Sequence, residues 1–314
     1  MGKKIFWGGI LFLILFCWIF GCERKKEVKV ITVSGAWALY PMMVKWSEEY
    51  QNLHSEVKID ISAGGAGKGM ADVLGGMVDI GMVSREIYPE EVQRGAFYIA
   101  VVKDAVVVTV NEKNPFLKEL GSRGVKRSEL QKIWVSGEIK DWGELVGRSV
   151  HSPVSVYTRS DACGAGEVWA KFLGVKQEDL RGVGVYGDPG VAQAVRSDVL
   201  GIGYNNIGYA YDYKSGREIS GIRVLGIDLD EDGVLEMEED FYSSLDKLKG
   251  AIADGRYPSP PARELYLVFK GSPKKSQVLE FVKWILKDGQ EYVSEAGYIR
   301  LSSERLREEL GRLD

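Results

Sequence analysis

Residues 28–50 have the sequence VKVITVSGAWALYPMMVKWSEEY, which changes from a strand pattern to a helix pattern across one turn. The β-branched run Val28–Val33 predicts a buried strand, and Ser34-Gly35 interrupts it. Pro41 suits the first turn of a helix, because its missing N–H would have no partner there. One helical face then carries Leu39, Met42, Trp46 and Tyr50. The stretch therefore predicts a strand, a turn of small residues and an amphipathic helix.

The same alternation continues along the chain. Further strands are predicted at Val57–Ile61, Asp79–Val83, Ala105–Val110, Val154–Tyr157, Gly201–Tyr204 and Leu265–Phe269. Between them lie helical stripes, one of which comprises Met70, Val73, Leu74 and Met77. Strands that alternate with helices predict an α/β fold with mostly parallel strands. A second α/β block is expected at residues 111–211.

The N-terminal segment has the layout of an export signal. Lys3 and Lys4 precede the apolar run Ile5–Phe20, and Gly21-Cys22 then leads into charged residues. Ile19–Cys22 resembles a bacterial lipobox, in which the cysteine is lipidated. We expect residues 1–22 to be a signal peptide with lipidation at Cys22, and residues 23–27 to be a tether. The alternative is an uncleaved membrane anchor. Either prediction places the folded part outside the cytoplasmic membrane.

Composition and charge argue against several classes of protein. The net charge is −4 and the chain has no long basic tract, which argues against a nucleic-acid partner. Cys17, Cys22 and Cys163 provide neither a disulfide framework nor zinc spacing. His54 and His151 lie beside no nucleophile motif, so we expect a binding protein and no catalytic residues. The alternative is an anion-handling enzyme such as a phosphatase.

Three predicted strand-to-helix turns have the composition of an anion site. Small residues allow the backbone to approach a ligand closely, and helix N-termini favour anions. Arg85 and Arg159 follow strands near these turns, and a guanidinium donates two hydrogen bonds to an oxyanion. For one turn or one arginine the alternatives are tight packing and a solvated charge. The candidate ligand-binding residues are Ala36, Trp37, Ala38, Ala66, Gly67, Ser84, Arg85, Arg159, Asp161, Cys163, Gly164 and Ala165.

These segments resemble the phosphate-binding protein family of Pst-type ABC importers over most of the mature chain. The resemblance rests on Ser34-Gly35 with Leu39–Pro41, Trp46 with Glu48–Tyr50, Gly64–Gly69, Val78–Met82 with Ser84–Ile87, Thr158–Asp161, Gly201–Tyr204 and Gly297-Tyr298. It implies the two-lobe periplasmic-binding-protein fold, with crossover strands and a central ligand cleft. One lobe would contain residues 28–110 and 212–314 and the other residues 111–211, with hinges near Val110-Asn111 and Tyr204–Asn206.

The resemblance also implies a function. The chain would be a monomeric, lipid-anchored receptor that delivers phosphate or a similar oxyanion to the permease of an ABC importer. The chain departs from the family at the three turns, where members usually have Ser and Thr hydroxyls and this sequence has Ala36, Trp37, Ala38, Ala66, Cys163 and Ala165. Arg85 stands where some members have a carboxylate that accepts the proton of hydrogen phosphate, a role for which Asp161 is the candidate here. The ligand therefore stays open among phosphate, arsenate, sulfate, molybdate and tungstate, and a sensor protein is a further alternative. Cys163 is either a small packed residue or a thiol that selects a soft oxyanion.

A second motif lies at residues 228–239, DLDEDGVLEMEE. It matches the EF-hand loop, with acidic residues at positions one, three and five and glycine at position six. The predicted ligands of a structural Ca²⁺ are Asp228, Asp230, Asp232, the Val234 carbonyl, Glu236 and Glu239. The alternative is an acidic surface turn, and the strand pattern of Gly221–Ile227 argues against a complete EF-hand.

Overall fold

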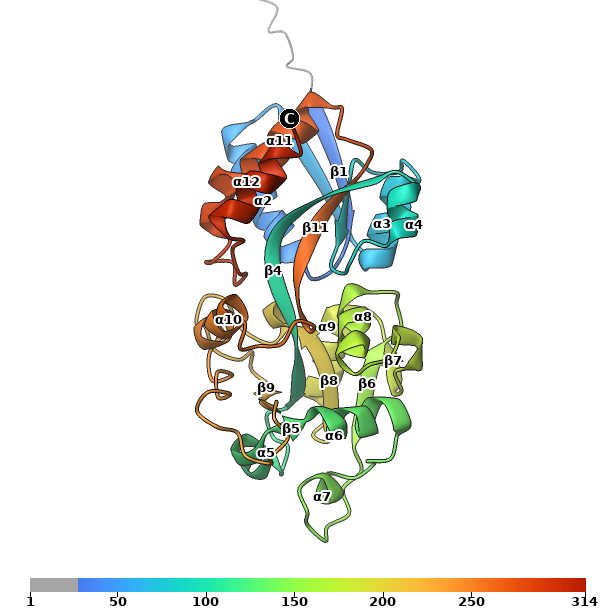
Figure 1. Cartoon of the computed structure of the whole chain (residues 1–314), viewed down its shortest axis with the longest axis vertical. Coiled ribbons are helices and arrows are strands. Elements are labelled where there is room, and N and C mark those ends of the chain that lie inside the picture. The colour runs from blue at the N-terminus through green and yellow to red at the C-terminus, as the bar shows by residue number, and fades with distance from the viewer. Residues whose placement is uncertain (1–27) are drawn as a thin grey trace, which may run out of the picture.

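The computed structural model describes residues 28–314, which form two α/β lobes joined by crossing strands (Figure 1). The predicted two-lobe α/β architecture with crossover strands is confirmed. The expected signal peptide, Cys22 and tether lie outside the described residues. Among residues 28–314, no helix combines the length and apolar character that crossing a membrane requires.

The first lobe, at the top of Figure 1, has the strand order β2-β1-β3-β11-β4. β1 is parallel to β2 and β3, whereas β11 is antiparallel to β3 and β4. The strands are β1 (Lys29–Gly35), β2 (Val57–Ala63), β3 (Ile80–Val83), β4 (Ala96–Asn111) and β11 (Ala262–Lys270). The helices and helical turns are α2 (Tyr40–Leu53), α3 (Ala66–Leu74), α4 (Pro89–Gln93), α11 (Ser276–Leu286), η4 (Asp288–Tyr292) and α12 (Ser303–Gly311).

The opening strand and helix form as their pattern predicts. Leu39, Met42 and Trp46 are fully buried, and Tyr50 is nearly so. The indole Nε1 of Trp46 donates to the Gly289 carbonyl at 2.7 Å, which satisfies its one polar atom inside the core. The predicted stripe of the next helix is wrong at Met77, which is 77% exposed because α3 already ends at Leu74.

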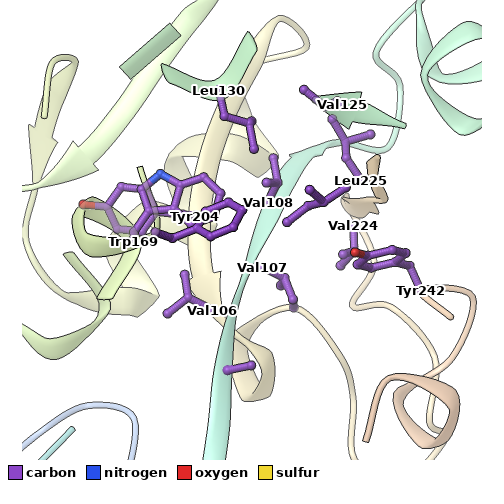
Figure 2. Packing of buried hydrophobic residues seen from close by; sticks show 14 of the residues in the cluster. Val106, Val107, Val108, Val125, Leu130, Trp169, Tyr204, Val224, Leu225 and Tyr242 are labelled. Atoms are coloured by element: carbon purple, nitrogen blue, oxygen red, sulfur yellow. The ribbon is translucent and has the colours of Figure 1, made fainter. Parts of the chain in front are cut away.

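The second lobe continues the sheet with β4, β8, β6 and β7, and β9 pairs with the far end of β4. Its core packs Trp169 against Tyr204, close to Val106 and Leu130 (Figure 2). The strands are β5 (Val125–Lys126), β6 (Ser155–Arg159), β7 (Val183–Val185), β8 (Gly201–Asn206), β9 (Ile222–Leu225) and β10 (Ile227–Asp228). The helices and helical turns are α5 (Leu117–Arg123), α6 (Arg127–Gln131), η1 (Lys132–Ser136), α7 (Trp142–Leu145), α8 (Gly164–Phe172), η2 (Gln177–Asp179), α9 (Gly187–Ser197), η3 (Ile207–Tyr209) and α10 (Leu245–Asp254).

One long strand, β4, belongs to both lobes. Its residues 96–105 pair with β11, and its residues 106–110 pair with β8. The passage between lobes therefore lies at Ala105-Val106, and the chain returns at Ala262, the first residue of β11. The expected hinge at Val110-Asn111 lies instead within the second lobe, where both residues pair with β9.

The two hydrophobic cores also divide the chain differently from the predicted boundaries at 110 and 212. Val106–Val108 and residues from Val224 to Tyr257 pack in the second core, although they were expected in the first lobe. Residues 262–314 mostly return to the first core, as expected. The boundaries could not be predicted from the sequence, because an apolar strand has the same residue pattern in either lobe.

A buried ion pair lies beside the crossing strands. Asp104 is 1% exposed, and its Oδ2 lies 3.5 Å from Nη2 of Arg263, which also donates to the side-chain oxygen of Asn206. Burial raises the pKa of Asp104 to about 7, although Arg263 opposes the shift. Burial at this position therefore destabilises the ionised form of Asp104 relative to the protonated form.

We expect Asp104→Asn to change how stability depends on pH. The folded-state pKa lies above the unfolded value, so between about pH 4 and pH 7 the unfolded chain releases this proton first. The free energy of unfolding should then fall as pH rises through that window, by up to about 4 kcal/mol. Urea denaturation at several pH values should show this component in the parent protein and not in Asp104→Asn. The exposed Asp246→Asn serves as a control, and parallel curves for the parent and Asp104→Asn would contradict the assignment.

Candidate functional site

The three glycine-bearing turns come together where the lobes touch. The amides of Gly64 and Gly65 both donate to the Gly35 carbonyl, at 2.9 and 3.1 Å, which joins the first and second turns. The amide of Gly67 donates across the lobes to the Ala162 carbonyl at 3.3 Å, which joins the second turn to the third. The predicted convergence of the turns is therefore present in the structure.

Close approach explains the glycine at position 65. Its φ is +90°, and a Cβ there would lie 2.9 Å from both the Ala162 carbonyl oxygen and Oδ2 of Asp161. Only a residue without a side chain combines this backbone conformation with that contact. The second turn consequently lies directly against the third.

Two helices begin at this contact. α3 starts at Ala66 and α8 starts at Gly164. The first N–H groups of a helix have no carbonyl of the same helix to pair with, and they carry the positive end of the helix dipole. The backbone donors of Ala66, Gly164 and Ala165 are therefore suited to an anion, and they do not depend on hydroxyl side chains.

Cys163 precedes α8 and caps it. It is 2% exposed, and its Sγ accepts a hydrogen bond from the Gly166 amide at 3.2 Å. Burial raises the pKa of its thiol to about 12, although Arg159 opposes the shift. A protonated, capping thiol favours the packed-residue interpretation over the soft-oxyanion one.

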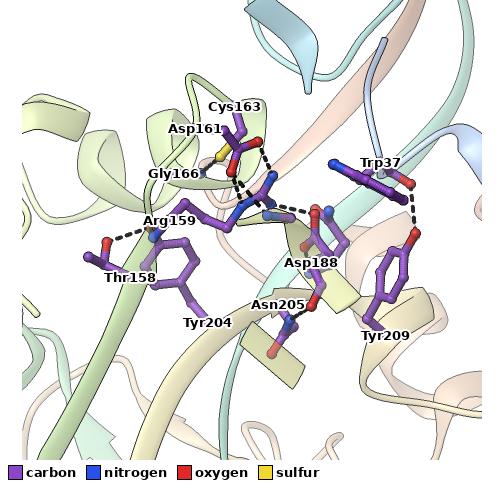
Figure 3. Close-up of polar contacts among 12 residues, drawn as sticks. Trp37, Thr158, Arg159, Asp161, Cys163, Gly166, Asp188, Tyr204, Asn205 and Tyr209 are labelled. Atoms are coloured by element: carbon purple, nitrogen blue, oxygen red, sulfur yellow. Dashed lines mark hydrogen bonds and ion pairs between the residues drawn. The ribbon is translucent and has the colours of Figure 1, made fainter. Parts of the chain in front are cut away.

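Arg159, at the end of β6, lies at the centre of the site (Figure 3). It is 5% exposed, and its Nε and Nη2 donate to the two oxygens of Asp161 at 2.8 and 2.5 Å. Its Nη1 donates to Oδ2 of Asp188 at 2.5 Å. Burial by itself lowers the pKa of this guanidinium, but Asp188 and Asp161 outweigh it and raise the pKa above its ordinary value. The buried charge is thus fixed by two carboxylates.

Asp188 connects Arg159 to the strands behind it. Its Oδ1 accepts from the Asn206 amide at 3.2 Å, and its carbonyl accepts from the side chain of Asn205 at 3.1 Å. Asn206 in turn accepts from Arg263, the partner of Asp104. A continuous polar network therefore runs from the site to the crossing strands.

Arg85 has different partners from those expected. Its Nη1 and Nη2 donate to the two carboxylate oxygens of Glu91, at 2.8 and 2.7 Å, and its Nε lies 3.1 Å from Oε1 of Glu167 in the other lobe. Tyr88 stacks under the guanidinium and donates to Glu167 at 2.6 Å. In this arrangement Arg85 joins the lobes through ion pairs, rather than presenting free donors to an anion.

Trp37, in the first turn, lies between the two lobes at one side of the site. Its ring lies against Gly187, edge-on to Tyr186, and its carbonyl accepts from Tyr209 at 3.2 Å. Its neighbours Ala36 and Ala38 are buried, at 1% and 3% exposure. Both alanines belong to the first hydrophobic core, whereas the ring of Trp37 lies against the second lobe.

A cavity of about 1320 Å³ lies between the lobes and includes both arginines. Its lining contains five basic and five acidic side chains, so it is not a uniformly positive surface. Attraction of an anion would therefore depend on local donors rather than on the overall field. Lining residues from both lobes are Arg85, Glu86, Tyr88, Arg159, Asp161, Glu167, Lys171, Lys176, Gln177, Glu178, Arg263, Glu264 and Tyr266.

A family model described as the PBP superfamily domain matches residues 23–288. The chain belongs to the PBP superfamily.

Named relatives agree with this PBP superfamily assignment. The chain is 25% identical over 297 residues to the phosphate-binding protein PstS of Staphylococcus haemolyticus, covering 92% of this chain and 85% of that protein. It is 24% identical over 322 residues to the PstS of Methanocaldococcus jannaschii, covering 85% and 81% respectively.

Solved structures show the same PBP fold. A Clostridium perfringens protein with bound phosphate superposes with a TM-score of 0.72 at 22% identity, covering 87% of this chain and all of that one. An ABC-type phosphate transport receptor from Vibrio cholerae gives a TM-score of 0.62 at 20% identity, covering 86% of this chain and all of that one.

Sequence reasoning missed four acidic or aromatic residues of this PBP site: Asp188, Glu91, Glu167 and Tyr88. Asp188 had a usable signal, because Gly187-Asp188-Pro189-Gly190 is a fourth small-residue turn after a strand. Glu91 pairs with Arg85 locally, within the first lobe and six residues further along the chain. Glu167 had no signal, because it is an acidic residue on a helix and only the approach of α8 to Arg85 gives it a role.

Gly164→Ala should disturb the lobe contact of this PBP protein. An added Cβ would lie 2.1 Å from the Ser84 carbonyl oxygen and 2.2 Å from its Oγ, across the interface. We expect a larger radius of gyration in small-angle scattering, with the contact weakened by about 1–3 kcal/mol. Gly250→Ala in α10 is the matched control, because a Cβ there meets nothing within 4 Å. An unchanged radius for Gly164→Ala would show that the lobes do not make this contact in solution.

Proposed function

We propose that this chain is an extracytoplasmic solute-binding protein that captures phosphate, or a similar tetrahedral oxyanion, and delivers it to an ABC importer. The observation that carries the proposal is the buried Arg159 beside the starts of two helices from opposite lobes. Relatives named phosphate-binding protein PstS and a neighbour with bound phosphate support the choice of ligand.

The proposal includes a lipid anchor at Cys22, a permease as partner and a monomeric receptor. The apolar run Ile5–Phe20 followed by Gly21-Cys22 supports the anchor and an extracytoplasmic location. We also propose that the protein performs no catalysis. His54 and His151 pair with the carboxylates of Glu56 and Asp141, away from Arg159, and the His151 side chain is 90% exposed.

The two carboxylates beside Arg159 suggest how the ligand would be selected. An ionised carboxylate only accepts hydrogen bonds, so it tolerates an oxyanion that carries a proton and repels one that does not. Asp161 and Asp188 would therefore favour hydrogen phosphate and hydrogen arsenate over sulfate, molybdate and tungstate. The same carboxylates occupy the guanidinium donors, so an incoming anion must compete with them for Arg159.

Calorimetry with the five oxyanions on the form lacking residues 1–22 tests the proposal. We expect phosphate and arsenate to bind at least about tenfold more tightly than sulfate, molybdate or tungstate, a difference of about 1.4 kcal/mol. Arg159→Ala should abolish phosphate binding, because it removes the one buried cation in contact with both carboxylates. Asp188→Asn should tighten phosphate binding and reduce the discrimination against sulfate, since it removes one competing charge while preserving size.

Arg300→Ala, which removes an exposed arginine of the first lobe, should leave the affinity unchanged. Arg159→Ala leaves two buried carboxylates unpaired and is expected to lower stability, so Asp188→Asn provides the second, better-folded variant. If none of the five oxyanions binds the parent protein, or if Asp188→Asn weakens phosphate binding, the proposed ligand class or site is wrong.

A further inference from the structure

The acidic loop of residues 228–239 is held in place by the second lobe. It starts on β10, which pairs in parallel with β5 through Ile227 and Asp228. The Leu235 amide donates to the Ser122 carbonyl at 3.2 Å, and the Ser128 amide donates to Oε1 of Glu231 at 2.8 Å. The loop therefore has a fixed path over the segment that joins α5 to α6, independent of any ligand.

Five carboxylates of this loop converge. Oxygens of Asp228, Asp230 and Asp232 lie within 4.8 Å of one another, and so do oxygens of Asp230, Glu236 and Glu239. Asp230 belongs to both groups, so the two groups form one cluster. The members occupy positions one, three, five, nine and twelve of the EF-hand spacing, with Gly233 at position six and a φ of +97°.

The observation that most favours a cation-binding site is the carboxylate of Asp228. This side chain is fully buried, and among the described residues its Oδ1 accepts no hydrogen bond, while its Oδ2 accepts from the Gly233 amide at 2.7 Å. Oε2 of Glu239 is likewise buried without a hydrogen-bond partner among those residues. A buried anionic oxygen without a partner is costly, and four further carboxylates nearby add repulsion instead of relieving it.

We infer that residues 228–239 bind one Ca²⁺ ion. The ligands are the side chains of Asp228, Asp230, Asp232, Glu236 and Glu239, together with the carbonyl of Val234. Oxygen-only ligands select a hard cation, and the mixture of acidic side chains on a bent loop suits the larger, more flexible coordination of Ca²⁺ better than the strict octahedron of Mg²⁺. The ion neutralises the unpaired oxygen of Asp228 and the repulsion among its neighbours.

The position of the loop indicates a structural role. It follows β10 and precedes α10, within the chain that leads back to β11 and the first lobe. Leu235 packs against Gly124 and Gly226, so a fixed loop also holds β5 and β10 together. The Ca²⁺ therefore stabilises the second lobe near its long return connection, and the inference does not depend on the proposed oxyanion.

Calcium titration of the full-length chain, kept in detergent and stripped of divalent cations, tests this inference. Calorimetry should give one site with a Kd of about 10⁻⁴ M or tighter, and 10 mM CaCl₂ should raise the Tm by about 5 °C. Mg²⁺ should bind at least about tenfold more weakly. Asp228→Asn and Asp230→Asn should each weaken the Ca²⁺ affinity by about tenfold or more, and Asp230 is exposed, so the second variant should fold as the parent does.

Glu238→Gln is the matched control, because it removes a negative charge from the same loop at an exposed position outside the ligand set. It should leave the Ca²⁺ affinity within about twofold of the parent value. The inference would be overturned if Ca²⁺ neither changed the Tm of the parent protein nor gave a heat of binding. An equal response to Mg²⁺, or an equal loss in Glu238→Gln, would also overturn it, since both indicate diffuse charge screening instead of a coordinated ion.

Discussion

The structure depends above all on neutralising one buried positive charge, the guanidinium of Arg159. At 5% exposure this group cannot be solvated by water, and an unpaired ion in that environment is strongly destabilising. Asp161 and Asp188 remove that cost, and they come from different elements, the turn before α8 and the first turn of α9. Satisfying Arg159 therefore fixes the mutual positions of β6, α8 and α9, which form the face of the second lobe that meets the first.

The same pairing connects the site to the passage between lobes. Asp188 accepts from the backbone of Asn206, and Asn206 shares Arg263 with Asp104 next to the crossing point of β4. These groups are buried, so moving one of them away from its partner leaves another unpaired. A ligand that competes with Asp188 for Arg159 would consequently act on groups adjacent to the crossing strands. This gives a physical route by which occupation of the cleft could bias the lobe arrangement.

Interactions between the lobes in this chain are made largely by charged and aromatic side chains. Arg85 links to Glu167, Lys171 to Glu86, and Tyr88 to Glu167. Trp37 lies against the start of α9. Partly exposed ion pairs contribute little each, whereas the buried Arg85–Glu91 pair holds the guanidinium in place for its partner across the interface. The cleft therefore combines the backbone N–H groups of two helix starts with carboxylates that already pair with its arginines.

The sequence by itself determined the alternation of strands and helices, the three turns, the importance of Arg159 and the spacing of the acidic loop. Each of these depends on local patterns, such as the apolar stripe of Leu39 to Tyr50, small residues at strand ends, or carboxylates at fixed offsets. Only the tertiary structure decided the lobe boundaries, because the continuous apolar run of β4 pairs with β11 in one half and with β8 in the other. It also decided that Arg85 pairs with Glu167 and that Asp188 joins Arg159. These pairings follow from the approach of elements distant in the chain, which the short-range pattern of residues does not specify.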